Sequence, residues 1–349
     1  MKQFNRRSFL TLAAIAGGTA LLGLYGCSPA SAPAAPAASE APAKVEPLSK
    51  LAIQGPMSPP TILLAHLAGQ EGLKSKVGEV NFATYKSPDQ VRAGVTSGEL
   101  HVAAVPTYLA ANLYNRGLDV RLINVNVWGI LHVMTADEGL KSWADLAGKT
   151  VAVPFKGDMP DLVFRYLAQH NGLDLEKGAK VQYVSAPTEA MQLLLAGKAD
   201  AAVLHEPVAT AAQMQGQLKG MKVRAMMDLQ QEWAKATGRK AEIPQAGVMV
   251  TGALVKSHPE VVQAIQDGLK TSVNWVVQNP GAAAELGTQY LGELKAPVIE
   301  KSLGRTPLKW VPATEARADL EFFFGRLMEL SPDIVGGGLP AEAFYWSGK

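Results

Sequence analysis

An internal repeat with an offset of about one hundred residues constrains the fold of this 349-residue chain more than any other feature. The segment that starts at Leu51 aligns without a gap to the segment that starts at Val151, and Pro60 and Pro160 fall at equal places in the two copies. Each copy indicates a short apolar strand, a loop that ends in proline, and a helix with apolar residues at helical spacing. Proline suits the first helical turn because the N–H that it lacks would have no partner there.

The repeat extends through a second strand–helix–strand unit. Residues 88–105 resemble residues 187–204: each begins with proline, predicts an amphipathic helix that ends at Gly98 or Gly197, and finishes in a small apolar strand. Any two such units look alike in chains rich in alanine and leucine, but the shared proline and glycine positions make coincidence the weaker explanation. Two such units predict an α/β fold with two lobes, each a mostly parallel sheet flanked by helices.

Two strand-like segments, residues 122–128 and 245–251, flank the second copy and are natural places for the chain to cross between the lobes. We therefore expect lobe 1 to comprise residues 51–127 together with 247–349, and lobe 2 to comprise residues 128–246. The two crossing segments would act as hinge strands, and the helical C-terminal part would return to lobe 1.

The N-terminal residues have the pattern of an export signal. Basic residues precede an apolar run, Leu10–Tyr25, which is shorter than the roughly 20 residues that a membrane-spanning helix needs. Arg6 and Arg7, followed by a Phe-Leu pair, resemble the twin-arginine export signal. We therefore expect a signal peptide over residues 1–27.

Cys27, the only cysteine of the sequence, ends the stretch Leu24-Tyr25-Gly26-Cys27, which resembles a bacterial lipobox although Tyr25 is larger than usual there. Lipidation of this cysteine would anchor the protein, and residues 28–50, rich in Ala, Pro and Ser, would form a disordered tether. An uncleaved anchor helix is the alternative. We expect export to the periplasm or cell surface, with a lipid anchor to the membrane.

Composition excludes several classes of function. The net charge of +2 offers no basic field for nucleic acid, and a single cysteine allows neither a disulfide framework nor a thiolate metal site. The sequence contains no nucleophile-elbow motif, no phosphate-cradling loop and no dinucleotide fingerprint. We therefore expect no cofactor, no metal and no catalysis, and a small molecule as the ligand.

In open parallel sheets, ligands bind beyond the carboxyl ends of the strands. Four predicted loops lie there, at residues 54–60, 105–108, 154–160 and 204–207. Each precedes a helix, so backbone N–H groups and the positive end of the helix dipole would face a ligand between the lobes. The candidate ligand-binding residues lie in these loops and at the hinges: Ser58, Pro59, Thr61, Thr107, Tyr108, Trp128, Phe155, Lys156, Gly157, Asp158, Met159, His205, Glu206 and Gln245.

Each candidate also has a structural explanation. Ser58 and Asp158 suit the N-caps of the helices that follow them, and Trp128 suits a buried core. Lys156 is either an anion contact or a solvated loop lysine. His205-Glu206 lacks the second histidine of a zinc-binding His-Glu-x-x-His motif, so interlobe hydrogen bonding is the better explanation there.

Five segments carry a family resemblance: residues 94–105, 142–153, 196–207, 257–262 and 337–340. Together they resemble the nitrate/sulfonate/taurine-type periplasmic solute-binding proteins of ABC importers, a type II family related to thiamine-pyrimidine-binding proteins. The resemblance covers the chain after the tether. It implies two lobes that close around one molecule, and a monomer that then docks on permease subunits in the membrane.

Two other functions stay open on sequence alone. A ligand-sensing subunit of a signalling system would share the fold and the anchor, and related folds include thiamine-pyrimidine-synthase-like enzymes. The ligand is also open. Helix N-termini and Lys156 favour a sulfonate, nitrate, carboxylate or similar anion, whereas Tyr108, Trp128 and Phe155 with Asp158 favour a small heterocycle. The anion is slightly favoured.

Overall fold

A computed structural model describes residues 47–348 of the chain. The expected signal peptide, the lipidation site Cys27 and most of the expected tether lie outside these residues. Strand β1 begins at Leu48, inside the expected tether, because Leu48 pairs with Val77 at the start of the sheet. Among the described residues, no helix combines the length and apolar character needed to cross a membrane.

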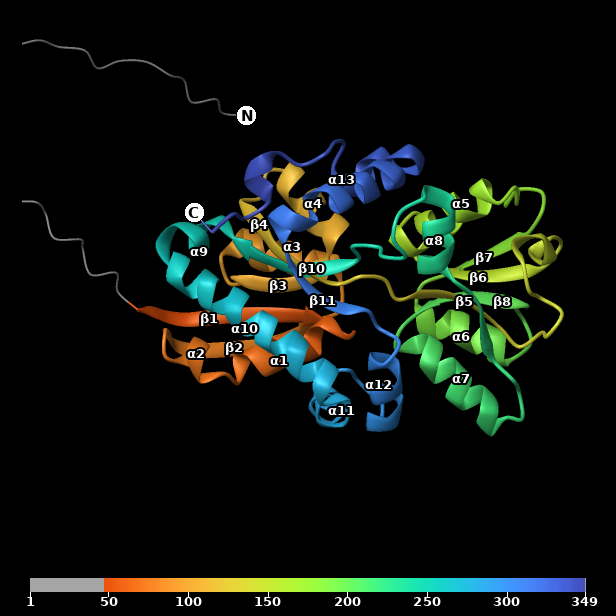
Figure 1. The fold of residues 1–349 in the computed structure, drawn as a ribbon, viewed down its shortest axis with the longest axis horizontal. Coiled ribbons are helices and arrows are strands. Elements are labelled where there is room, and N and C mark those ends of the chain that lie inside the picture. The colour runs from red at the N-terminus through yellow and green to blue at the C-terminus, as the bar shows by residue number, and fades with distance from the viewer. Residues whose placement is uncertain (1–46, 349) are drawn as a thin grey trace, which may run out of the picture. The chain divides into compact units, whose positions relative to one another are not determined.

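The first sheet has six strands in the order β11-β4-β10-β3-β1-β2 (Figure 1). Strand β1 runs parallel to both β2 and β3, whereas β10 runs antiparallel to β3 and β4, and β11 antiparallel to β4. The bounds are β1 Leu48–Pro56, β2 Val77–Tyr85, β3 Val102–Pro106, β4 Val120–Val127, β10 Ala246–Thr251 and β11 Leu308–Pro312.

The second sheet has five strands in the order β7-β6-β8-β5-β9. Here β6 runs parallel to β7 and β8, and β5 runs antiparallel to β8 and β9. The three parallel strands of each sheet are the repeated segments, which confirms the predicted two-lobed α/β fold. We call the part built on the first sheet lobe 1 and the part built on the second sheet lobe 2. The bounds are β5 Leu131–Thr135, β6 Thr150–Pro154, β7 Lys180–Val184, β8 Ala201–His205 and β9 Arg224–Asp228.

Helices connect and flank the strands in both lobes. Prolines stand in the first turn of α1, α3, α5 and α6, as the repeat predicted. The bounds are α1 Pro60–Ala68, α2 Glu71–Lys74, α3 Pro88–Ser97, α4 Thr107–Asn115, α5 Met159–His170, α6 Pro187–Leu195, α7 Val208–Leu218, α8 Leu229–Thr237, α9 Gly252–Ser257, α10 Pro259–Gln278, α11 Pro280–Thr288, α12 Ala296–Leu303 and α13 Ala313–Leu330.

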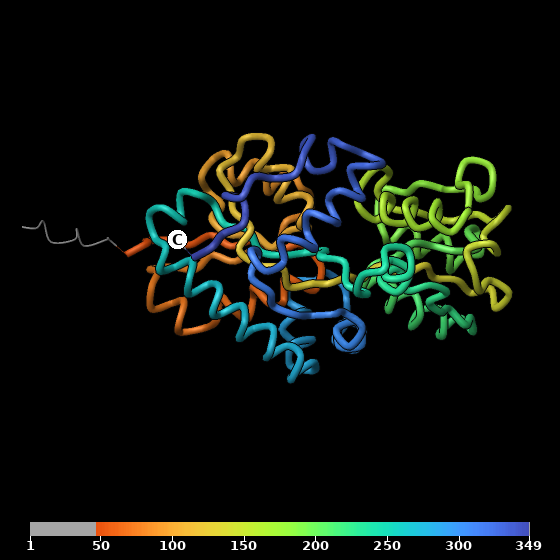
Figure 2. Tube along the Cα trace, turned by 45° about the horizontal axis from the view of Figure 1, so that its top comes forward, coloured from red at the N-terminus to blue at the C-terminus, as the bar shows by residue number. Residues whose placement is uncertain are grey.

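The chain passes between the two sheets twice, after β4 and before β10. The two crossings are hydrogen-bonded to each other: the N–H of Ile243 donates to the carbonyl of Trp128 at 3.1 Å, and the N–H of Gln245 donates to that of Val127 at 3.0 Å. Figure 2 shows the C-terminal segment back beside lobe 1, where the N–H of Trp346 donates to the carbonyl of Leu122. The predicted boundaries between the two lobes, at residues 127/128 and 246/247, stay a prediction.

Two sets of contacts join the lobes. On one side, α13 lies against α5 and α8, and the ring of Trp233 on α8 meets those of Phe322 and Phe323 edge to face. On the other side, α12 lies against α7. Burial of a large apolar side chain contributes roughly 1.5–3 kcal/mol, so the aromatic contact is a substantial part of the joint.

Candidate functional site

Four strands end at the predicted loops, two in each lobe. In lobe 1, β1 ends at Pro56 before α1, and β3 ends at Pro106 before α4. In lobe 2, β6 ends at Pro154 before α5, and β8 ends at His205 before α7. The repeat therefore places four helix starts beyond the carboxyl ends of parallel strands, where a doubly wound sheet offers a ligand its backbone N–H groups.

One side-chain contact joins the predicted loops of the two lobes. The phenol of Tyr108, near the start of α4, lies close to the carboxylate of Asp158. Burial, and then the negative charge of Asp158, hold the pKa of Tyr108 above its ordinary value, so the phenol keeps its proton and stays a donor. Asp158 is also the N-cap of α5, since its carboxylate accepts from the N–H of Met159 at 2.6 Å. Met159 itself is buried in the core.

The loop before α5 has a constrained backbone. Phe155 adopts a left-handed conformation with φ of 58°, which is costly for a residue with a Cβ, and its side chain is 40% exposed. The N–H of Gly157 donates to the buried carboxylate of Asp161 at 2.8 Å, so this N–H is already satisfied within the loop. Burial raises the pKa of Asp161.

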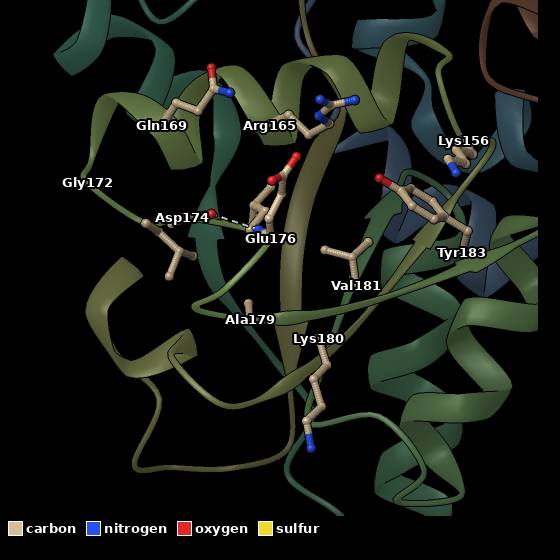
Figure 3. Close-up of a pocket in the computed structure, with 12 residues that line it drawn as sticks. Lys156, Arg165, Gln169, Gly172, Asp174, Glu176, Ala179, Lys180, Val181 and Tyr183 are labelled. Carbon is tan, nitrogen blue, oxygen red and sulfur yellow. Dashed lines mark hydrogen bonds between the residues drawn. The ribbon is translucent and has the colours of Figure 1, made fainter.

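Lys156 lies on the outer side of this loop. Its ammonium group is 5.2 Å from the centre of the Tyr183 ring, a cation–π contact with β7 (Figure 3). Both residues line a surface cavity of about 800 Å³ whose wall comes from α5, β7 and the turn between them, all within lobe 2. The cation–π contact of Lys156 therefore lies within lobe 2.

The hydroxyl groups of the lobe 1 loops are directed to the backbone. The Thr61 hydroxyl donates to the carbonyl of Pro56, and the Thr107 hydroxyl donates to that of Pro244 at 2.5 Å. Pro59 is the buried N-cap residue of α1, and that helix has no side-chain cap, so the N-cap role considered for Ser58 is wrong. Ser58 is half-buried beside it.

The hinge candidates are buried and satisfied. Trp128 donates its indole N–H to the carbonyl of Lys309 at 2.9 Å. Gln245 accepts from the N–H of Ile130 at 3.0 Å through its side chain, and from the N–H of Thr107 at 3.0 Å through its carbonyl. These bonds tie the first residue of α4 to both crossings, and so fix the position of the loop between β3 and α4 relative to the hinge.

Glu206 is the centre of a buried polar cluster at the end of β8. Its carboxylate is fully buried, accepts from the N–H of Thr210 at 3.2 Å, and lies 3.1 Å from the Arg305 guanidinium. His132 on β5 lies 3.7 Å from the same carboxylate. Burial raises the pKa of Glu206 and lowers the pKa of His132 to about 4. Burial also lowers the pKa of the neighbouring His205, whose ring contacts the carbonyl of Glu206 at 2.8 Å.

Sequence reasoning missed Arg305, His132 and Thr210. A histidine between the apolar residues Leu131 and Val133 of this strand was a usable signal, because a polar residue in a buried strand needs an explanation. No sequence pattern near Arg305 indicates that it contacts Glu206. Within residues 47–348, no group of three metal-ligating side chains is placed to hold a metal ion.

The model of the family described as ABC transporter, phosphonate, periplasmic substrate-binding protein matches residues 62–274. No curated protein matches the chain in sequence. Among solved structures, an ABC transporter protein from Parabacteroides distasonis is similar with a TM-score of 0.70 and 24% identity, over 86% of this chain and 100% of that one.

Two further solved structures share the fold. The periplasmic aliphatic sulphonate-binding protein of Escherichia coli has a TM-score of 0.66 and 16% identity, over 86% of this chain and 92% of its own. The periplasmic nitrate-binding protein of Synechocystis PCC 6803 has a TM-score of 0.60 and 13% identity, over 82% of this chain and 84% of its own. At these identities the likeness shows the type II periplasmic-binding-protein fold.

Proposed function

The chain belongs to the periplasmic substrate-binding proteins of ABC transporters, and from this premise we propose that it is an exported lipoprotein that captures a small anion between its two lobes. The family's members bind small ligands and work with membrane permeases. The finer statements, which are the ligand class, the residues that hold it and the anchor at Cys27, are our proposal.

We infer the location of the site from the contact between Tyr108 and Asp158. Tyr108 is the second residue of α4 in lobe 1 and Asp158 is the N-cap of α5 in lobe 2, so their proximity makes the loops after β3 and β6 neighbours. A ligand held by these loops touches both lobes at once, and its binding energy then favours their closure.

The helix starts favour an anion as the ligand. An oxyanion at the start of α4 or α7 accepts from backbone N–H groups and is stabilised by the helix dipoles. The start of α5 is less open to an anion, because the Asp158 carboxylate already accepts from the N–H of Met159. Support also comes from the phosphonate description of the family model and from the sulphonate and nitrate names of similar structures. The charge of Lys156 adds little, because this side chain packs on Tyr183.

A small heterocycle is the alternative ligand, and the same Tyr108–Asp158 pair supports it. A protonated phenol and a carboxylate side by side offer one donor and one acceptor, the pattern that a ring with N–H and carbonyl groups requires. The two classes differ in charge, so a ligand screen separates them.

The test is a thermal-shift screen of the full chain, purified in detergent, against sulphonates, phosphonates, nitrate, carboxylates and pyrimidines. A ligand that binds only the folded state stabilises it by RT ln(1 + [L]/Kd), about 2.7 kcal/mol at a concentration of roughly 100 Kd. We expect stabilisation by an anion and no consumption of it on prolonged incubation. Stabilisation by pyrimidines alone would refute the anion, and turnover would refute a transport function.

The anchor is tested separately. We expect the mature N-terminal peptide to carry acyl chains on Cys27, and the Cys27→Ser variant to be released from membranes without loss of ligand binding. Mass spectrometry of the N-terminal peptide measures the modification. An unmodified N-terminus on membrane-bound protein would favour the uncleaved helix. Binding that fails to stimulate the permease-coupled ATPase in proteoliposomes would favour the sensing subunit.

A further inference from the structure

The buried carboxylate of Glu206 is paired with a cation that comes from the other lobe. Glu206 lies between β8 and α7 in lobe 2 and has no exposed surface. The Nε of Arg305 lies 3.1 Å from its Oε1. A buried carboxylate is destabilising unless it is paired, so Arg305 provides the charge that Glu206 needs in this arrangement.

Arg305 belongs to lobe 1. It follows α12, whose residues Ile299 and Leu303 pack in the same apolar core as β1 and α1. The guanidinium makes a second contact across the lobes, since its Nη1 donates to the side-chain oxygen of Gln213 on α7 at 2.5 Å. One planar guanidinium therefore contacts both Glu206, just before α7, and Gln213 in the middle of α7, a geometry that a lysine ammonium does not reproduce.

The surroundings exclude most solvent from this pair. Leu294 and Val298, beside and within α12, pack against the apolar cluster formed by α6 and α7. The Arg305 side chain is 24% exposed. A second interlobe ion pair has a different environment: Arg239 and Asp319 are 2.6 Å apart, but their side chains are 37% and 43% exposed. Exposed pairs contribute little, whereas a desolvated pair depends strongly on both partners.

We propose that Arg305 is a clasp that holds lobe 1 against lobe 2 through its ion pair with Glu206 and its hydrogen bond to Gln213. The clasp biases the lobes toward the closed arrangement and thereby raises the affinity of the interlobe site. The effect on affinity rests on the proposed function, in which the ligand binds between the lobes. The effect on the lobes themselves does not.

The first experiment measures the separation of the lobes. Spin labels are placed at Asp89→Cys on α3 and Thr188→Cys on α6, two exposed positions, in a full chain with Cys27→Ser so that only these cysteines react. Pulsed electron spin resonance gives the distribution of distances between the labels. We expect Arg305→Met to shift and broaden this distribution.

Two variants keep the result interpretable. Arg305→Met leaves Glu206 without its cation, so the double variant with Glu206→Gln removes both charges and must shift the distribution to the same extent. Asp319→Asn is the matched control, because it removes a charge from the exposed interlobe pair while Arg239 keeps its contact with the ring of Phe322, and it must leave the distribution unchanged. An unchanged distribution in the folded double variant, or an equal shift in Asp319→Asn, would overturn the clasp.

The second experiment links the clasp to binding. With an anion identified by thermal shift, the double variant is expected to bind it at least about fivefold more weakly, the lower end of ordinary coupling between sites. Calorimetry measures the Kd. If no ligand is found, the proposed function fails while the spin-label result still decides the clasp. If the ligand binds the double variant as tightly as the wild type although the lobes have opened, the clasp does not control the site.

Discussion

A buried histidine gives this protein a predictable sensitivity to acid. His132 lies in β5 with 4% of its surface exposed, and among the described residues neither ring nitrogen has a hydrogen-bond partner. Burial lowers its pKa to about 4. The carboxylate of Asp228 on β9 acts against this shift, and the Arg305 guanidinium adds to it. The folded protein therefore holds His132 neutral at physiological pH.

The sign and size of the effect follow from linkage. The unfolded chain takes up a proton at this side chain near the ordinary pKa of about 6.5, while the folded chain does so only near 4. Between these values the unfolded state binds more protons, so the free energy of unfolding falls as the pH falls. The pKa of His132 differs by about 2.5 between the unfolded and folded states, which corresponds to roughly 3 kcal/mol. The free energy of unfolding therefore falls by about this amount between neutral pH and about pH 4. Above about pH 7 His132 is neutral in both states, so it does not make the free energy of unfolding depend on pH.

The test compares the His132→Leu variant with the wild type. Urea unfolding measures the free energy of unfolding of both proteins from about pH 7.5 to about pH 4. A leucine needs no hydrogen-bond partner, so we expect the two proteins to differ by less than about 1.5 kcal/mol near neutral pH, as volume-conserving core changes do. Toward pH 4 the variant should become the more stable, by up to about 3 kcal/mol.

The difference between the two proteins measures His132 together with its interaction with Glu206, 3.7 Å away, and removes the contribution of more distant groups. Burial raises the pKa of Glu206 and of Asp161, and both shifts have the opposite sign: their protonation as the pH falls favours the folded state. His170→Leu, at an exposed position at the end of α5, controls for the loss of a histidine. Parallel curves for wild type and His132→Leu would refute the reasoning, since they would mean that the ring is charged or hydrated in the folded state.

Two further outcomes are expected from backbone positions. A Cβ on Gly247 would overlap the carbonyl oxygen of Asn124 on β4, so Gly247→Ala should lower the free energy of unfolding by about 1–3 kcal/mol. Gly72 has open space around it, so Gly72→Ala is the control and should not lower this free energy. Chemical denaturation measures both variants. Phe155→Gly relieves a left-handed backbone and should raise the free energy of unfolding by up to about 1 kcal/mol, so a lower melting temperature would contradict this expectation. The same variant should bind the anion found by thermal shift more weakly, and an unchanged Kd in calorimetry would contradict that expectation.

The features that sequence predicted well are local ones. Proline at the first turn of α3 and α6, and the glycine residues that follow these helices, come from backbone geometry that few other residues satisfy. Asp158 as the N-cap of α5 follows from the same local chemistry. Two copies of one local pattern were enough to predict two sheets of related order.

The side-chain partners at the site were not predictable in this way. Lys156 precedes a glycine in a strand–helix loop, a pattern that favours anion binding, but the left-handed Phe155 sets the course of the loop and the lysine packs on Tyr183. Glu206 and Arg305 are about one hundred residues apart in sequence, and nothing near either residue indicates the other. Only the tertiary arrangement of α12 against α7 brings them together.

The two joints between the lobes differ in what they can specify. The contacts of Trp233 with Phe322 and Phe323 are apolar and tolerate small sliding motions, since dispersion and burial depend weakly on angle. The Arg305–Glu206 pair joins a fully buried carboxylate to a guanidinium that is 24% exposed, so moving the lobes apart would leave the carboxylate without its cation. On the clasp proposal, the aromatic joint keeps the lobes together while Arg305 selects the closed geometry. An apolar replacement of the pair would then keep or raise the melting temperature and still lose that selection, because stability and geometry depend on different contacts.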